Sequence, residues 1–136
     1  MRKRCAAAAV LALWGALAAA PLSKKEQARS SAEAWVRLVD AGRYADSWTQ
    51  SSSLFRSRVP QQKWEAMAKK VRDRMGPLRS RKLRRVILAT SLPKAPPGEY
   101  AVVEFDSSFE KQPAAIERIT MMLEDGEWRA AGYYFV

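Results

Sequence analysis

The spacing of apolar residues divides the chain into a front part with helical periodicity and a back part with strand periodicity. From Ser23 to Gly42 apolar residues recur every three or four positions, which predicts a helix with a core-facing side of Ala28, Ala32, Trp35, Val36 and Val39. Gly42 is a natural end for this helix. A short second helix is predicted over residues 44–51, where three consecutive serines stop it.

A third helix is predicted between Pro60 and Gly76. Proline is favoured in the first turn of a helix, and the Gly76-Pro77 pair ends the helix cleanly. Its core-facing side is expected to carry apolar residues spaced by three or four positions, namely Trp64, Met67, Val71 and Met75.

After Pro77 the apolar positions follow a period of two, which is typical of β-strands. The Pro-rich segment 93–98 can only be a loop, a turn is expected near Gln112-Pro113, and Asp125-Gly126 predicts a tight hairpin. The strands are predicted over residues 83–91, 100–109, 116–123 and 128–136. The pattern predicts an α+β fold in which three N-terminal helices pack on one face of a four-stranded antiparallel sheet.

The second and third strands are expected to pair as a hairpin that places Glu104 opposite Arg118, Val102 opposite Thr120 and Asp106 opposite Ile116. The Glu104–Arg118 pair has two interpretations, which the sequence leaves open. It lies at the mouth of a pocket, or it is an ordinary cross-strand ion pair on the solvated face. A register slip of one residue would exchange the two faces of the sheet.

The first twenty residues predict a secretory signal peptide. A basic start is followed by an apolar run and by three small residues, and cleavage is expected after Ala18 or Ala20. The apolar run is shorter than the roughly 20 residues of a membrane span, and Cys5 precedes it, so this Cys is not expected to carry a lipid. Residues 21–136 then form one domain, expected in the periplasm or outside the cell and without a transmembrane span.

The composition limits the chemistry that the exported domain can perform. The chain has 24 Lys and Arg residues against 14 Asp and Glu, no His, and a single Cys that lies in the predicted signal peptide. Thiol catalysis, imidazole catalysis and Cys/His zinc sites are therefore excluded from the mature domain. The sequence also lacks a phosphate-binding glycine loop and a serine-nucleophile elbow. We expect no cofactor, no metal and no enzymatic activity.

Four separated segments carry a family resemblance: AWVRLVDAGRYADSW, KWEAMAKKVRDRMGPLRSRKL, PPGEYAVVEFDSSF and GEWRAAGYYF. Together they resemble the domain-of-unknown-function family DUF4019, a bacterial and mostly exported group, over residues 29–135. The resemblance implies a cone-shaped domain similar to the nuclear transport factor 2-like superfamily. It implies almost nothing about function, because that architecture hosts isomerases, cyclases, immunity proteins and scaffolds.

Basic residues are concentrated in the middle of the chain. Residues 69–85 hold nine basic residues and one acidic residue, whereas residues 99–129 hold eight acidic and three basic residues. One interpretation is a solvated helix face and a guarded edge strand, with Arg79 and Arg81 paired to Glu104 or Asp106. The other is a surface for anionic lipid or envelope polymer, with contacts from Lys82, Arg84 and Arg85. Nucleic acid is not expected as the partner of an exported protein.

Aromatic side chains predict a ligand site between the helices and the sheet. The domain is then a non-enzymatic binding or accessory module that holds a small apolar ligand or a protein partner, and it is able to form a homodimer. The alternative is that the same aromatic side chains pack against one another in the hydrophobic core and form no ligand site. The candidate ligand-binding residues are Trp35, Tyr44, Trp48, Trp64, Tyr100, Glu104, Arg118 and Tyr133.

An alternative function assigns an acid–base pair to Asp40 and Tyr44, as in cofactor-independent isomerases and cyclases. That role requires an apolar site that raises the pKa of Asp40 well above about 3.9. Asp40 lies near the C-terminal end of a predicted helix, where the helix dipole disfavours an anion. It therefore needs a partner such as Arg37, Arg43 or a backbone N–H, and with such a partner it merely ties the helix to the next turn.

Overall fold

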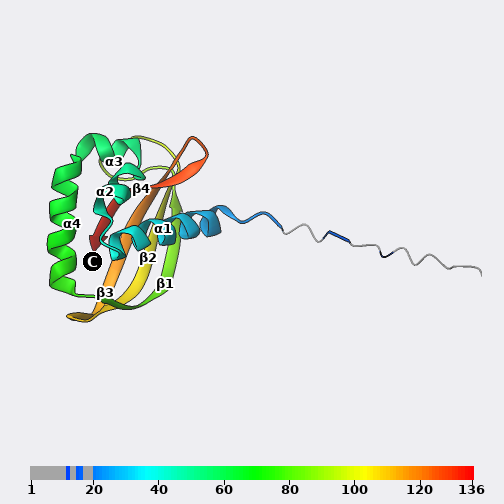
Figure 1. Ribbon diagram of the computed structural model, residues 1–136. Helices are drawn as coiled ribbons and strands as arrows, with labels where there is room; N and C mark the ends of the chain where they lie inside the picture. The colour runs from blue at the N-terminus through cyan, green and yellow to red at the C-terminus, as the bar shows by residue number, and fades with distance from the viewer. Residues whose placement is uncertain (1–11, 13–14, 17–19) are drawn as a thin grey trace, which may run out of the picture.

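The described part of the chain folds into four helices followed by four strands (Figure 1). The structure, a computed structural model, describes residues 12, 15–16 and 20–136. The elements are α1 (Lys24–Asp40), α2 (Tyr44–Thr49), α3 (Ser53–Arg58), α4 (Gln61–Met75), β1 (Leu78–Ala89), β2 (Tyr100–Phe109), β3 (Gln112–Glu124) and β4 (Glu127–Phe135). The four strands form one antiparallel sheet in the order β1-β2-β3-β4, which confirms the α+β class.

Most of the predicted signal peptide, with Cys5 and the first cleavage position at Ala18, lies outside the described residues. Among the residues that are described, no helix is long and apolar enough to cross a membrane.

Helix α1 begins at a capping box. The Ser23 hydroxyl accepts a hydrogen bond from the Glu26 N–H at 3.2 Å, and the Glu26 carboxylate accepts one from the Ser23 N–H at 3.1 Å. The helix ends before Gly42, whose φ of 72° few other residues adopt without strain. All five residues predicted for its core-facing side are buried.

Helix α3 was not predicted, so the domain has four helices rather than three. The Ser52 hydroxyl accepts a hydrogen bond from the Phe55 N–H at 3.1 Å, which caps the new helix where a break was expected. A serine run is read from sequence as a stop signal, but here it ends α2 and starts α3. Phe55 becomes part of the hydrophobic core as a result.

Helix α4 has the predicted bounds but presents a different side to the core. Its buried residues are Trp64, Ala68 and Arg72, whereas Met67 is 50 % exposed and Val71 is 38 % exposed. The predicted core-facing side was therefore wrong at both of these residues. The helix is rotated so that Arg72, which carries a charge and is usually exposed, reaches an acidic partner inside the domain.

The sheet follows the predicted register between β2 and β3. Glu104 lies opposite Arg118, Val102 opposite Thr120 and Asp106 opposite Ile116. The Asp125-Gly126 hairpin is also confirmed, since both residues adopt a positive φ, at 51° and 79°. Strands β1 and β3 start five and four residues earlier than predicted, because the chain pairs with β2 directly after Pro77 and turns at Glu110-Lys111 instead of Gln112-Pro113.

The two faces of the sheet have different surroundings. On the inner face, α1 crosses all four strands, as it does in front of the sheet in Figure 1, and buries Val103, Phe105, Ile119 and Met121. Within the described part of the chain, α3 and the loop 90–99 cover one end of the outer face. A large part of the outer face is therefore left open to solvent, including Ile87 and Tyr134.

Candidate functional site

Four charged side chains form a buried ion network on the inner face. Arg81 of β1 donates to Asp40 at 2.7 and 2.9 Å and to Glu117 of β3 at 2.7 and 3.2 Å. Arg72 of α4 donates to Asp40 at 2.7 Å. Glu117 is 0 % exposed and also accepts hydrogen bonds from the hydroxyls of Ser107 and Tyr133. The network ties α1 and α4 to the sheet.

The pKa values in this network follow from its pairing. Burial alone would raise the pKa of Asp40, but the bonds from Arg81 and Arg72 outweigh burial and hold the pKa below its usual value of 3.8. Burial alone would lower the pKa of Arg81, and its two acidic partners reverse the sign and raise it. Burial, together with the Glu117 carboxylate, raises the pKa of Tyr133. Asp40 and Arg81 therefore stay ionised at neutral pH.

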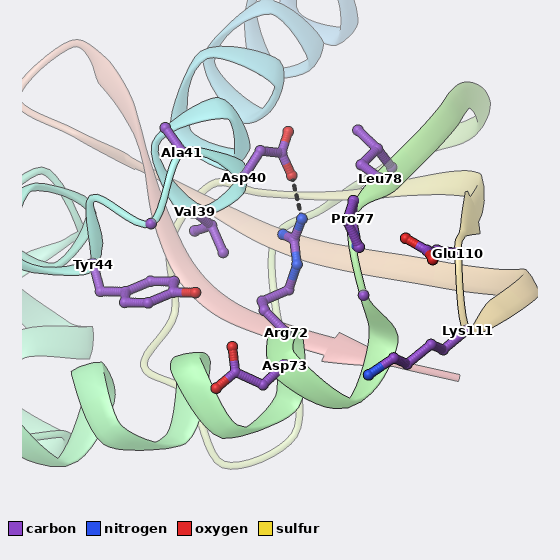
Figure 2. A pocket seen from close by; sticks show the side chains of 12 residues that line it. Val39, Asp40, Ala41, Tyr44, Arg72, Asp73, Pro77, Leu78, Glu110 and Lys111 are labelled. Atoms are coloured by element: carbon purple, nitrogen blue, oxygen red, sulfur yellow. Dashed lines mark hydrogen bonds and ion pairs between the residues drawn. The ribbon is translucent and has the colours of Figure 1, made fainter.

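An open cavity of about 720 Å³ lies beside the network, between the end of α1, α4 and the turn from β2 to β3. Figure 2 shows Arg72 reaching from α4 to Asp40, with the ring of Tyr44 beside them. Asp40 and Tyr44 thus line one cavity, but no hydrogen bond joins them, and the partners of Asp40 are Arg72 and Arg81 rather than Arg37 or Arg43.

The aromatic residues between the helices and the sheet are packed against one another. Trp35 lies 5.8 Å from Trp64 and 5.6 Å from Tyr133 between ring centroids, and Phe55 meets the edge of Trp64 at 5.3 Å. Both indole N–H groups are bonded inside the domain, from Trp35 to the Ser47 carbonyl and from Trp64 to the Ser47 hydroxyl, each at 2.9 Å. These residues form hydrophobic core.

Trp48 is partly buried and packs against the edge of this core. Its indole N–H donates to the Val59 carbonyl at 2.7 Å, and the guanidinium of Arg56 stacks over its ring at 6.0 Å. Trp48 therefore fastens α2 to the end of α3.

An open-face groove of about 610 Å³ runs over the outer face of the sheet, between β1 to β4, α3 and the loop 90–99. Its floor and walls include apolar side chains such as Ile87, Leu92 and Val102. Tyr100 is buried at one end, where its hydroxyl donates to the Pro96 carbonyl at 2.6 Å. Arg58 stands on the rim and donates to the Lys94 carbonyl at 2.9 Å.

Glu104 in the floor of the groove holds two arginines. It is 2 % exposed, and Arg85 donates through Nε to one carboxylate oxygen while Arg118 donates to the other at 3.0 and 3.3 Å. The Arg118 guanidinium also lies 5.8 Å from the centre of the Tyr134 ring. The bond from Arg85 and then the bond from Arg118 lower the pKa of Glu104 against the effect of burial, so the carboxylate stays charged.

The eight candidate ligand-binding residues fall into separate places. Tyr100, Glu104 and Arg118 meet in the open-face groove, Tyr44 lines the cavity beside Asp40, and Trp48 lies between α2 and α3. Trp35, Trp64 and Tyr133 pack together in the core. The sheet itself separates the core group from the groove group, because adjacent positions of a strand point to opposite faces.

The three candidate anion contacts lie on β1. Arg84 pairs with Asp106 at 3.2 Å and Arg85 pairs with Glu104, whereas Lys82 has no ion-pair partner among the residues described. Arg81 was expected to pair with Glu104 or Asp106, and that expectation was wrong. Arg81 lies opposite Ser107, so its side chain points to the inner face, where it forms ion pairs with Asp40 and Glu117.

Three important residues were missed from the sequence: Glu117, Arg72 and Ser107. The sequence does contain a signal for Glu117. It lies two and four residues before the apolar Ile119 and Met121, and residues spaced by two share one face of a strand, so Glu117 belongs to the buried face of β3. A charged residue in such a position needs a charged partner. No comparable signal marks Arg72, because its spacing from Trp64 and Ala68 looks like a polar interruption of a helix.

These observations define an α+β domain with a packed aromatic core, a buried ion network and an arginine-lined groove. Among the described side chains, no group of three or more His, Cys, Asp or Glu residues is placed to hold a metal ion. The chain belongs to the family DUF4019, described as proteins of unknown function, whose model matches residues 31–133. None of the curated proteins matches the chain.

Proposed function

We propose that the domain is a non-enzymatic binding module that holds an amphipathic carboxylate, such as a fatty acid, in the open-face groove. One observation carries the proposal: the buried Glu104 fixes two arginines, Arg85 and Arg118, in the floor of an otherwise largely apolar groove. A site of this kind offers an apolar surface and a fixed positive charge together.

The charge of the groove supports an anionic ligand. Glu104 neutralises only one of its two arginines, and Arg58 on the rim adds another positive charge. Arg85 uses its Nε for Glu104 and bonds through neither terminal nitrogen within the described part of the chain, and its side chain is about half exposed. A guanidinium with free terminal nitrogens binds a carboxylate through two parallel hydrogen bonds. Because Glu104 already orders the arginines, binding costs less conformational entropy.

The apolar part of the groove supports a ligand with a hydrocarbon body. Two large side chains of the groove are unusually exposed, Ile87 at 43 % and Tyr134 at 45 %. Both line the groove together with other apolar residues of the outer face. A contiguous apolar surface of this kind is typical of a ligand or partner site. The groove volume of about 610 Å³ also lies within the usual range for small-molecule sites.

The electrostatics of both acidic sites favour binding over catalysis. A carboxyl group acts as a general base at neutral pH most effectively when its pKa is raised, whereas the arginines lower the pKa of Asp40 and of Glu104.

The proposal also includes export to the periplasm or outside the cell, a homodimer, and a cone-shaped fold of the nuclear transport factor 2-like superfamily. The position of α1 across one face of the sheet supports the cone.

The test is calorimetric titration of the purified protein with decanoate, and with decyltrimethylammonium as a cation of similar length. We expect decanoate to bind and the cation not to bind. Arg85→Gln and Arg118→Gln should each weaken decanoate binding about tenfold or more, because each removes a charged hydrogen-bond donor. Arg129→Gln on β4, outside the groove, is the matched control. Equal binding of decanoate by all four proteins would overturn the proposal.

A further inference from the structure

The outer side of α4 is a surface that the groove proposal leaves unused. In Figure 1 this helix lies at the margin of the domain. Trp64, Ala68 and Arg72 face the core, and the opposite side is exposed over three turns. We define the α4 outer face by the residues at positions i, i+4, i+7, i+8 and i+11 of this helix, which are Lys63, Met67, Lys70, Val71 and Arg74.

Two large apolar side chains stand one turn apart at the edge of this face, next to the core-facing Trp64. Met67 is 50 % exposed and Val71 is 38 % exposed. Both have the spacing of a buried helical face, yet the core uses the neighbouring side of the helix instead. The domain thus presents to solvent an apolar pair that its own packing does not need.

Three cations lie beside this apolar pair, on the side away from the core. Lys63, Lys70 and Arg74 are exposed and form no ion pair within the part of the chain that the structure describes. The other basic residues of α4 are engaged, since Lys69 pairs with Asp73 at 2.7 Å and Arg72 with Asp40 at 2.7 Å. The α4 outer face itself contains no acidic residue. The face therefore carries three positive charges beside two apolar side chains.

We infer that the α4 outer face docks the domain on an anionic phospholipid bilayer. The helix lies in the plane of the surface over about 16 Å, the rise of eleven residues. Lys63, Lys70 and Arg74 bind lipid phosphates, while Met67 and Val71 enter the boundary between headgroups and acyl chains. The long stems of the lysines and arginine reach outward past the apolar pair, which lets both contacts form together.

The apolar pair decides between a bilayer and a soluble polyanion. A nucleic acid or an acidic polymer offers phosphates or carboxylates, and it has no apolar layer beneath them that would take up Met67 and Val71. A bilayer offers anions at its surface and hydrocarbon directly below. The inference is independent of the open-face groove, because it uses none of the groove residues.

The test is sedimentation of the purified full chain with vesicles of phosphatidylcholine alone or mixed with phosphatidylglycerol. We expect binding only to the anionic vesicles, and weaker binding as the salt concentration rises. The double variant Lys70→Gln and Arg74→Gln should lose about 25-fold in affinity, at about fivefold for each cation. The matched control, Lys25→Gln with Lys82→Gln, removes the same charge from α1 and β1 and should lose much less.

A second pair of variants tests the apolar contact. Met67→Gln with Val71→Gln leaves the net charge unchanged, and both positions are exposed, so the variant should keep the unfolding temperature of the wild type. We expect it to bind the anionic vesicles at least several-fold more weakly. Unchanged binding by this variant would overturn the inference. Equal losses of affinity in the charge variant, Lys70→Gln with Arg74→Gln, and in its control, Lys25→Gln with Lys82→Gln, would also overturn it. Equal binding to double-stranded DNA, with the same loss of affinity in the variant Met67→Gln with Val71→Gln, would also overturn it.

Discussion

Arg81 and Glu117 are joined by two hydrogen bonds, at 2.7 and 3.2 Å, although β2 lies between the strands that carry them. The pair spans the inner face of the sheet, and Ser107 of β2 donates to the same carboxylate from between them. A buried carboxylate with no exposed surface is costly unless it is paired and hydrogen-bonded, so this contact determines much of what substitutions in the domain should do.

Removing the charge of Glu117 should destabilise the domain strongly. Glu117→Gln keeps the size of the side chain but leaves the buried guanidinium of Arg81 with one acidic partner fewer, and we expect a loss of about 3 kcal/mol in the free energy of unfolding. Urea unfolding measures it. Glu127→Gln, at an exposed position at the start of β4, is the matched control and should change stability by less than about 0.5 kcal/mol. Similar losses in both variants would contradict the role of the network.

The stability of the domain should fall in acid partly through Asp40. Its pKa in the folded protein lies below the usual 3.8, so its ion pairs contribute stability above that value, and the contribution is lost as the pH falls through the folded pKa. Asp40→Asn should therefore be less stable than the wild type at neutral pH, and the gap should narrow below about pH 4. Urea unfolding between neutral and acidic pH tests this. Parallel pH profiles of the two proteins would contradict it.

Ser47 should contribute more to the free energy of unfolding than the size of its side chain suggests. Its hydroxyl accepts from the Trp64 indole at 2.9 Å and donates to the Tyr44 carbonyl at 2.7 Å, so Ser47→Ala leaves a buried indole N–H without a partner. We expect a loss of about 2 kcal/mol. Ser57→Ala is the matched control, since the Ser57 hydroxyl makes the same kind of bond to a carbonyl three residues earlier but on the surface. A loss below 0.5 kcal/mol in Ser47→Ala, as expected on the surface, would mean that water replaces the hydroxyl.

Two glycines with a similar φ should respond differently to alanine. Gly76 has φ 76° and ψ −176°, and an added Cβ would lie 3.2 Å from the Cβ of Glu110 and 3.3 Å from the Cγ of Lys111. Gly42 has φ 72°, and nothing lies within 4 Å of an added Cβ. We expect Gly42→Ala to cost about 1 kcal/mol and Gly76→Ala about 3 kcal/mol. Thermal unfolding compares them, and equal costs would contradict the steric part of the prediction.

The sequence predicts those parts of the fold that depend on local pattern. The register of β2 against β3 follows from alternation in both strands, and the hairpin at Asp125 follows from the conformational preferences of its two residues. The exposed side of α4 depends on distant contacts instead. Trp64, Met67 and Val71 fit one helical face by spacing, and only the position of Asp40 in space explains why Arg72 is buried in place of two apolar residues.

The candidate site was predictable to a similar extent. Glu104 and Arg118 were placed opposite each other correctly, because the strand register alone decides that pair. Arg85 joins them through an irregularity between Leu83 and Arg85, which turns Arg85 to the outer face while Arg81 and Leu83 point inward. A bulge of this kind has no signature in a basic strand, so the second arginine of the groove could not be assigned from the sequence.

The contact between Trp35 and Tyr133 has a consequence for the order in which the domain can form. Trp35 lies on the first helix and Tyr133 on the last strand, and their ring centroids are 5.6 Å apart. A chain that leaves the ribosome N-terminus first cannot complete its core until β4 has been synthesised, because long-range contacts form only when both partners exist. Such a chain stays open during most of its synthesis, a state that the export proposed above requires.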